Sequence, residues 1–539
     1  MRIKQSSTAV IDNDSLLDMY VKIKNRFKRT SFLESLGNTN LDTSRYTIIG
    51  VIAKKQLVMY TDRCLMTDFS DGSKKEVDFL EVIDQFVNVH TIPGVESSPI
   101  QLGSIGYMGY ELKHYFEKLD KSLKKDFKGP DGCLVKYSVL YVVDKIEEKA
   151  YWVFEDSIGD EYIEELEKLV DKETEFKVEK FNVLGDVHAD FTKEEYLDMI
   201  RKTREYIAAG DIFQANITCR FHGKYVGDPF ALYVHLRKTT PNPFFAYLDY
   251  EEPIISTSPE RFFKIQDDKI FSYPIKGTIE CEIDGVDQKD TLLNSEKDYA
   301  ENVIITDLIR NDIGYVCKQG SVKVDALCAV KRFNHIYHLE SIIEGELKDD
   351  VGMGDVLRAN FPGGSITGAP KIRCMDIIEE LENTQRGPYT GAIGFWGENG
   401  YVDTSIGIRI VYFDSDSFYL HAGGGITYAS DPESEYEELM TKAVSLVNAL
   451  REFNILKEHR EKIDRLDRVF LQTLNDRLEV VKEVGRIKRK YGISVMQDGR
   501  VKEMLEKRKK MCTEFENIPE EFVEEIFTNI VEVAMAMER

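Results

Sequence analysis

The chain has 539 residues, of which 42% are hydrophobic and 31% are charged, and its formal net charge is −24. This length exceeds what one hydrophobic core normally holds, so two or more domains are expected. The acidic balance argues against a nucleic-acid partner. No apolar run is long enough for a membrane-spanning helix, so no membrane partner is expected.

The eight cysteines are scattered and form no CxxC pair, which argues against a zinc site and against a disulfide framework. Residues 1–5 lack the apolar core of a signal peptide. Both observations predict a cytoplasmic protein.

Short aromatic and β-branched runs between turn residues predict strands over residues 30–155. They are RYTIIGVIA, KQLVMYT, GSIGYMGYE, LVKYSVLYVVD and AYWVFED. A charged helix, DEYIEELEKLVDKE, follows them, and then a polar linker near residues 172–190.

Helices and strands mix from residue 191 onward. One helix begins with a capping-box pattern, Thr192 to Glu195, and ends at Gly210. Further helices are SEKDYAENVIITDLIRND and SEYEELMTKAVSLVNALREF. Strand patterns occupy residues 211–222, 244–250, 253–257, 261–266, 269–275, 391–397, 401–413 and 417–422. Clusters of strands separated by helices predict an α+β fold.

The last part of the chain differs in charge and in pattern. Residues 451–539 carry 19 basic and 19 acidic side chains, so the whole acidic excess lies before residue 451. This change predicts a boundary near residue 452. Beyond it an apolar helical period predicts three helices, the first ending at Gly492, the second starting near Asp498 and the third following Pro519.

Two predicted helices place carboxylates on one face. Asp298 and Glu301 are three residues apart on the first, and Glu435, Glu438 and Lys442 share a face of the second. Carboxylates from two helices suit Mg²⁺, although the same spacing is typical of a solvated helix surface.

Other short motifs indicate ligand contacts. FPGGSITGAPKIR is a glycine-rich loop that runs into a helix whose free N–H groups could bind an anion, and HAGGGITY is a glycine-rich turn after a strand. Arg409 ends the strand SIGIRI, where an arginine wants a carboxylate partner. In SYPIKGTIE, Lys276 stands at the end of a strand, beside Gly277.

In this order the motifs resemble those of the chorismate-utilising synthases, the large subunits of anthranilate synthase and aminodeoxychorismate synthase. The matching stretches span roughly residues 30–445 and include FLES, GYMGYE, AGDIFQANI, SPERF, PIKGT, HLES and GPYTGAIGFWG. The resemblance implies a two-layer β-sheet core with outer helices, in which residues 1–170 form a β-rich N-terminal part and residues 190–450 the catalytic part.

The resemblance also implies roles for individual residues. Glu301 and Glu438 should hold Mg²⁺, with Asp298 and Glu435 nearby. The substrate carboxylates should be bound by Thr367, Arg409, Gly423 and Gly425, and the site should be lined by His338, Gly277, Thr278 and Lys442. Phe395 stands where the family often has tyrosine.

Lys276 bears on which reaction the family resemblance implies. The aminodeoxychorismate branch typically has lysine here, proposed to attack C2 of chorismate, whereas the anthranilate branch typically has alanine. A lysine amine must be neutral to attack, so burial or cationic neighbours are expected to lower its pKa. Glu260 matches the general acid or base. Asn302 also favours the aminodeoxychorismate branch, whereas SFLES, with Ser35 in a possible aromatic amino acid site, resembles anthranilate synthase.

The tail carries cations at informative spacings. Arg477 and Lys488, 11 residues apart, share one helix face at a separation of about 16 Å, so they could hold both ends of a dianion. Arg460 does not fit this face and would have to come from a second copy. A salt-bridged surface helix would show the same pattern.

The tail resembles the all-helical chorismate mutases, which are intertwined dimers, over residues 455–539. This resemblance implies that chorismate is bound by Arg460 of the partner copy, Arg477, Lys488 and Arg500. Gln497 falls where the family often has aspartate, and Glu538 where it often has glutamine.

We therefore expect a bifunctional enzyme, with Mg²⁺-dependent amination of chorismate to 4-amino-4-deoxychorismate in the first part and rearrangement of chorismate to prephenate in the tail. No GxCxG amidotransferase motif is present, so ammonia should come from a separate glutaminase subunit. Two alternatives are an anthranilate synthase fused to the same tail, and a tail that is a non-catalytic regulatory and dimerisation module.

Overall fold

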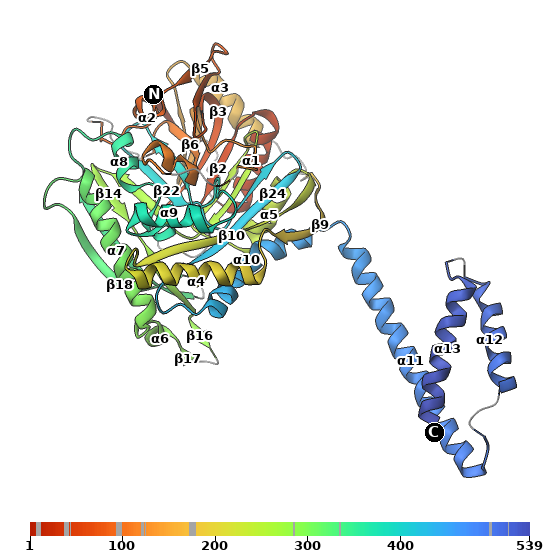
Figure 1. The fold of residues 1–539 in the computed structure, drawn as a ribbon. Helices are drawn as coiled ribbons and strands as arrows, with labels where there is room; N and C mark the ends of the chain where they lie inside the picture. The colour runs from red at the N-terminus through yellow and green to blue at the C-terminus, as the bar shows by residue number, and fades with distance from the viewer. Residues whose placement is uncertain are drawn as a thin grey trace. The chain divides into compact units, whose positions relative to one another are not determined.

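The computed structural model describes residues 1–6, 12–36, 43, 45–92, 100–119, 123, 125–171, 179–283, 286–333, 336–494, 498–515 and 517–538. The chain divides into two compact units, Met1–Ile455 and Leu456–Arg539. The division falls beside the change in charge composition. Figure 1 shows the elements of both units.

The first unit is built on antiparallel strands. Twenty-two of them are linked into one hydrogen-bonded system, and β16 pairs with β17 apart from it. The strands are β1 (Arg2–Gln5), β2 (Ser31–Glu34), β3 (Tyr46–Met59), β4 (Cys64–Asp68), β5 (Lys74–Val77), β6 (Gly103–Met108), β7 (Gly132–Asp144), β8 (Lys149–Phe154), β9 (Phe181–Ala189), β10 (Gln214–Gly227), β11 (Phe244–Leu248), β12 (Ile254–Ser258), β13 (Arg261–Gln266), β14 (Lys269–Ser272), β15 (Ile275–Glu280), β16 (Glu282–Ile283), β17 (Val286–Asp287), β18 (Lys323–Phe333), β19 (Ile336–Glu346), β20 (Gly368–Ala369), β21 (Ala392–Gly397), β22 (Val402–Ile406), β23 (Ile410–Asp414) and β24 (Ser417–Ile426).

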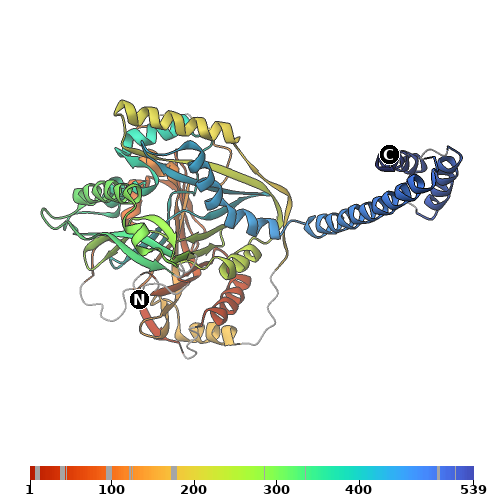
Figure 2. The same ribbon diagram turned by 90° about the horizontal axis from the view of Figure 1, so that it is seen from below.

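The helices of this unit lie outside the strands. They are α1 (Asn13–Arg26), α2 (Phe79–Phe86), α3 (Asp160–Asp171), α4 (Lys193–Ala209), α5 (Phe230–Thr239), α6 (Lys289–Leu293), α7 (Glu296–Val316), α8 (Met353–Asn360), α9 (Lys371–Leu381) and α10 (Pro432–Glu452), with 3₁₀ turns η1 (Tyr110–Tyr115) and η2 (Gly364–Ile366). Figure 2 shows α4 and α10 along the outside of the strands.

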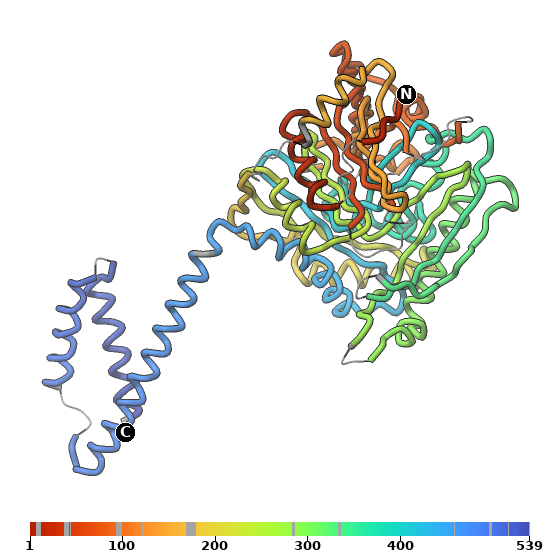
Figure 3. Tube along the Cα trace, turned by 180° about the vertical axis from the view of Figure 1, so that it is seen from behind, coloured from red at the N-terminus to blue at the C-terminus, as the bar shows by residue number. Residues whose placement is uncertain are grey.

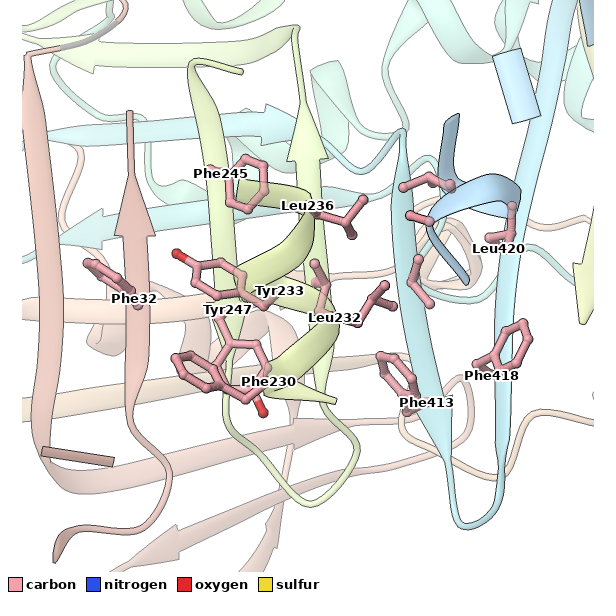
Figure 4. Packing of buried hydrophobic residues seen from close by; sticks show 14 of the residues in the cluster. Phe32, Phe230, Leu232, Tyr233, Leu236, Phe245, Tyr247, Phe413, Phe418 and Leu420 are labelled. Atoms are coloured by element: carbon pink, nitrogen blue, oxygen red, sulfur yellow. The ribbon is translucent and has the colours of Figure 1, made fainter. Parts of the chain in front are cut away.

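Three hydrophobic clusters explain this layering. One consists mainly of strand residues, such as Ile105 of β6, Leu140 of β7 and Tyr412 of β23, and fills the space between facing strands. The other two join strands to helices, one to α1, α4, α5, α9 and α10 and the other to α2, α7 and α8. Figure 4 shows part of the first helix–strand cluster, where Tyr233 and Leu236 of α5 meet Phe245 and Tyr247 of β11. The predicted α+β core with outer helices is confirmed.

The two predicted parts of the synthase form one body. Strand β2 pairs with β11, and β6 pairs with β21, so early strands are interleaved with later ones. Figure 3 shows the red and orange N-terminal segments packed against the green and cyan ones. Such pairing between distant segments leaves no signal in either segment alone.

Most predicted elements are present, and five predictions need correction. The two strands predicted over RYTIIGVIA and KQLVMYT are one strand, β3. The helix from the Thr192–Glu195 capping box to Gly210 is confirmed. The linker prediction near residues 172–190 is wrong at its end, because residues 181–189 form β9, while residues 172–178 lie outside the described residues. The strand predicted over 269–275 ends at Ser272, because Pro274 has no N–H for the ladder. The strand predicted over 401–413 is two strands, β22 and β23, and the glycines of HAGGGITY lie inside β24 rather than in a turn.

The second unit is helical, as predicted. Its helices are α11 (Lys457–Tyr491), α12 (Asp498–Cys512) and α13 (Glu520–Glu538). Gly492 ends α11 in the left-handed conformation, with φ 65°, which glycine adopts without strain. No helix among the described residues of either unit is long and apolar enough to cross a membrane.

Candidate active site

Lys276 lies near the start of β15, and not at the end of the preceding strand as predicted. Its Nζ donates a hydrogen bond to the backbone oxygen of Ser365, 3.3 Å away, in the glycine-rich loop around η2. Across the ladder it pairs with Leu339 of β19. Its side chain is partly buried, so the amino group is held against the loop instead of extending into water.

Gly277 makes this position possible. Its φ is +64°, and the ladder between β15 and β19 shifts register between Lys276 and Thr278. A Cβ at Gly277 would lie 2.8 Å from Cγ of Asp298 on α7. Glycine is therefore required both by the backbone conformation and by the close approach of the helix.

Glu301 and Asp298 come from the first turns of α7. Asp298 accepts a hydrogen bond from the hydroxyl of the N-cap Ser295 at 2.6 Å, so one of its oxygens is already used. Glu301 is buried, and its Oε1 has no hydrogen-bond partner among the described residues. Burial raises the pKa of Glu301, while the charges of Lys276 and Lys297 act against this shift.

Glu435 and Glu438 project from the start of α10, and each forms an ion pair with a lysine. Lys297 Nζ lies 3.1 Å from Glu435 Oε1, and Lys442 Nζ lies 2.6 Å from Glu438 Oε1. Lys442 also donates to the backbone oxygen of Gly423. A metal ion bound by these carboxylates would compete with the two ammonium groups for the same oxygens.

The glycines of β24 form the floor between the two helices. A Cβ at Gly424 would lie 3.3 Å from Glu435 Oε2 and 3.9 Å from Glu438 Oε1, and one at Gly425 would lie 3.6 Å from Glu301 Oε2. Bare backbone therefore faces the carboxylates of both helices. Three of the four predicted carboxylates, Glu301, Glu435 and Glu438, lie around this floor, and Glu301 Oε1, which has no hydrogen-bond partner among the described residues, could hold a divalent cation.

Glu260 is a further carboxyl group close enough to Lys276 to be affected by its charge. It is buried, and the side chain of Ser365 and the backbone of Ile275 lie close enough to its carboxyl group to act on its pKa. Burial raises the pKa of Glu260, and the charge of Lys276 is the largest opposing influence. A carboxyl group with a raised pKa beside a lysine can give and take a proton during a reaction.

Buried carboxylates are electrostatic partners of Lys276. Its charge opposes the rise that burial causes in the pKa values of Glu260 and Glu301. Attack by a lysine amine requires that its proton be taken up, and these carboxylates are available as acceptors.

Arg409 lies in the break between β22 and β23, not at the end of a strand, and its φ is 52°. Its backbone oxygen accepts two hydrogen bonds from Thr257, which hold it in this strained conformation. Its guanidinium group makes no hydrogen bond or ion pair with any described residue. Burial lowers the pKa of Arg409, and a bound carboxylate would supply the missing counter-charge.

Thr367 is fully buried at the end of η2. Its hydroxyl donates to the backbone oxygen of Gly363 at 2.8 Å, so it stabilises the glycine-rich loop.

Arg386, which was not predicted as a site residue, also stabilises this loop. Its guanidinium donates to the backbone oxygens of Ile366 and Asn216 and pairs with Glu382 at 2.6 Å.

His338 faces Thr278 across the β15–β19 ladder. Burial lowers the pKa of His338 to about 4, and the charge of Lys331 contributes. The imidazole is thus neutral near pH 7. The side chain of Thr278 is exposed. Asn302, next to Glu301 on α7, donates to the backbone oxygen of Leu339 at 3.2 Å and so ties the helix to the strand beside Lys276.

Another group of possible metal ligands lies elsewhere in the unit. Among the described residues, ligand atoms of Glu111, His114 and Glu379 lie within 4.8 Å of one another. The ammonium group of Lys113 already lies 3.0 Å from Glu379 and 3.7 Å from Glu111. We interpret this cluster as a buried ion-pair network that stabilises the fold.

Ser35 lines a separate cavity of about 60 Å³ together with Tyr46 and Phe395. Its hydroxyl donates to the backbone oxygen of Tyr46 at 3.3 Å. A tyrosine at position 395 would therefore place its hydroxyl in the lining of this cavity.

In the tail, Arg477 and Arg508 lie near each other. Nη1 of Arg477 and Nε of Arg508 are buried and have no hydrogen-bond partner in the part of the tail that the structure describes. Burial lowers the pKa of Arg477, and the neighbouring charge of Arg508 lowers it further. Arg508 was not predicted as a site residue, because it lies in a continuous run of basic residues that gives no reason to prefer one of them. Nη1 of Arg500 lies 3.6 Å from Oε2 of Glu503. Gln497 lies outside the described residues, and of Glu538 only the backbone is described.

The family follows from a match over most of the first unit. Residues 42–448 match the model described as chorismate binding enzyme. The chain belongs to the chorismate binding enzymes. Residues 459–539 match chorismate mutase type II, so the second unit is a helical domain of that family.

Similar chorismate binding enzymes come from both predicted branches. Anthranilate synthase component 1 of Aquifex aeolicus is 32% identical over 481 residues, covering 84% of this chain and 95% of that protein. Aminodeoxychorismate synthase component 1 of Escherichia coli is 35% identical over 402 residues, covering 72% and 88%. The structure of anthranilate synthase component I from Streptococcus pneumoniae has a TM-score of 0.66 at 27% identity, covering 75% of this chain and 92% of that one. Overall sequence similarity therefore does not distinguish the anthranilate branch from the aminodeoxychorismate branch, and the choice depends on individual residues.

Proposed function

We propose that the first unit aminates chorismate to 4-amino-4-deoxychorismate, using ammonia from a separate glutamine amidotransferase subunit. The observation that carries this proposal is the amino group of Lys276, held at the glycine-rich loop with the carboxylates of Glu260 and Glu301 as electrostatic partners. Similar proteins are named as component 1, which fits a second component that supplies ammonia.

The proposed reaction begins with Lys276. Its neutral amine forms a bond to C2 of chorismate while the bond from C4 to its hydroxyl breaks, and Glu260 donates the proton with which that hydroxyl leaves as water. Ammonia then bonds to C4, the C2–nitrogen bond breaks, and the lysine amine is released. Arg409 binds a substrate carboxylate throughout.

Magnesium is the proposed cofactor. Glu301 and Glu438 would hold it, with Glu435 and Asp298 close by, and it would supply positive charge that stabilises the departing oxygen and the carboxylates. The unpartnered Glu301 oxygen and the bare backbone of Gly424 and Gly425 support this assignment.

The product decides between the two branches. With chorismate, Mg²⁺ and ammonium, we expect no fluorescent anthranilate, and 4-aminobenzoate only after aminodeoxychorismate lyase is added. Chromatography with fluorescence detection measures both. Anthranilate as the main product would instead establish the anthranilate synthase alternative.

We further propose that the tail converts chorismate to prephenate as a homodimer. Its support is the pair of adjacent arginines, Arg477 and Arg508, with unpartnered nitrogens. Large apolar side chains of α11 are exposed, such as Leu466 at 59% and Val469 at 62%, and a second copy would cover them. A dimer would also bring in Arg460 of the other copy.

Replacing Arg477 with alanine in the full chain should lower prephenate formation by roughly 100-fold, because a cation that binds a substrate carboxylate is lost. Amination should not change. Lys482→Ala, which removes an exposed ion pair with Glu479 on the same helix, is the matched control and should leave both activities intact. If the wild-type protein forms no prephenate but prephenate inhibits amination, the tail is a regulatory module.

The cavity at Ser35 is the proposed aromatic amino acid site. Apolar walls from Phe395 and Tyr46 and polar atoms from Ser35 and Arg45 match a ligand with a ring at one end and charges at the other, and the cavity of about 60 Å³ would have to widen to admit it.

A further inference from the structure

Arg261 connects the cavity at Ser35 with the carboxyl group of Glu260. Its side chain is fully buried, and its guanidinium donates to the Asp403 carboxylate at 2.8 and 3.0 Å. It also lies over the ring of Phe244, 5.3 Å from the ring centroid. Asp403 and Phe244 both line the cavity of about 60 Å³. A single buried cation is therefore held by two wall residues of the proposed aromatic amino acid site.

The same arginine lies next to the active site. Arg261 is the first residue of β13 and Glu260 directly precedes it, so the backbone position of one fixes that of the other. The Arg261 guanidinium lies 4.9 Å from the ring centroid of Tyr273, on the segment that leads into β15. Strand β22 joins both sides, because it contains the aspartate described above and because the N–H of Ile406 at its end donates to the Glu260 backbone at 3.0 Å. A shift of Arg261 therefore moves Glu260.

The wall of the cavity has to give way before an aromatic amino acid can enter. Phe245 and Phe395 are 1% exposed and belong to the packed core, where little space is available for movement. Phe244 is partly exposed, and the Asp403 side chain is 21% exposed, so both have solvent into which they can move. The two contacts that hold Arg261 are thus among the wall groups that can yield to a ligand.

We propose that Arg261 is a positioning residue for Glu260 and couples occupation of this cavity to amination. An aromatic amino acid that widens the cavity displaces Asp403 or Phe244. Arg261 then loses a contact that holds it, and the Glu260 carboxyl moves away from the hydroxyl that it protonates. Two sites and one shared element give a coupling free energy between them.

The inference predicts a particular kind of inhibition. The groups assigned to the substrate carboxylates do not depend on Arg261, so the amino acid should lower kcat and leave the KM for chorismate unchanged. The inference rests on the amination and on the aromatic amino acid site proposed above, and it can be tested whichever amine the enzyme forms.

Steady-state kinetics of the full chain with ammonium, with and without phenylalanine, tyrosine or tryptophan, test the coupling. A saturating amino acid should lower the wild-type kcat by roughly tenfold, because a displaced general acid loses most of its effect. Asp403→Asn weakens the pair with Arg261, so it should show a similarly lowered kcat without any ligand, an unchanged KM for chorismate and no further inhibition. Arg261→Lys keeps the charge but loses the two-point contact, and it should change kcat in the same direction if Asp403→Asn does not fold.

Asp144→Asn is the matched control. It weakens the other arginine–carboxylate pair at the cavity, in which Arg45 Nη2 lies 2.7 Å from Asp144 Oδ2. Neither partner belongs to the active site. The kcat of this variant and its inhibition at saturating amino acid should match those of the wild type.

Calorimetry of amino acid binding separates the possible failures, because it needs no activity. A bound amino acid that leaves the wild-type kcat unchanged would refute the coupling and keep the binding site. A wild-type kcat for Asp403→Asn without ligand, or inhibition as strong as in the wild type, would show that the coupling does not pass through Arg261. If none of the three amino acids binds, the amino acid site is wrong and the coupling with it. A protein that binds the amino acid but forms no aminated product would refute the proposed amination instead, and the coupling that rests on it.

Discussion

Replacing Lys276 with alanine should lower formation of 4-amino-4-deoxychorismate by roughly 100-fold or more, because the variant loses the nucleophile that activates C4. The Lys276 position remains open to ammonia, so a small amount of anthranilate is an expected by-product. Product chromatography measures both compounds. Wild-type protein incubated with chorismate in the absence of ammonia should also carry a covalent adduct detectable by mass spectrometry.

Lys276→Arg separates nucleophilic attack from charge. Arginine keeps a cation beside Glu260 and Glu301, but its guanidinium is protonated at all working pH values and does not attack carbon. We expect it to be as inactive in 4-amination as the alanine variant. If Lys276→Arg aminates C4 at the wild-type rate, the lysine acts through its charge, and the covalent step is wrong.

The local features of this site could be predicted because their causes are local. A strained or crowded backbone calls for glycine, which is why Gly277 stood out beside Lys276, and the structure shows both the positive φ and the contact with Asp298. The capping box from Thr192 to Glu195 and the end of α11 at Gly492 are short-range signals of the same kind.

What could not be predicted depends on contacts between distant segments. Lys297 pairs with Glu435 across 138 positions, and Arg386 holds Asn216 across 170. Nothing in either local sequence indicates such partners. The placement of Arg409 was mistaken for a similar reason. An apolar run is typical of one strand, whereas the break at residues 407–409 is held by hydrogen bonds to distant segments, from Thr257 to the Arg409 backbone and from Gly407 to Gly391.

Arg409→Met should lower kcat/KM for chorismate by roughly 100-fold or more, because truncating one partner of a buried charge pair costs about 2–5 kcal/mol. The stability of the ligand-free protein, by contrast, should not fall. The Arg409 guanidinium has no partner among the described residues, so its removal breaks no interaction in the ligand-free protein. Methionine also has a Cβ, so the strain at φ 52° is unchanged. The Tm without ligand should stay the same or rise.

Arg261→Met is the matched contrast for this prediction. Arg261 is 2% exposed, but its guanidinium bonds Asp403 at 2.8 Å and lies over the ring of Tyr273, so its loss leaves a carboxylate unpaired. We expect its Tm to fall by several degrees, whereas that of Arg409→Met should not. Thermal unfolding of the two variants, with and without chorismate, measures the difference. If Arg409→Met is destabilised as strongly as Arg261→Met, Arg409 serves the fold, and its assignment to the substrate carboxylate is wrong.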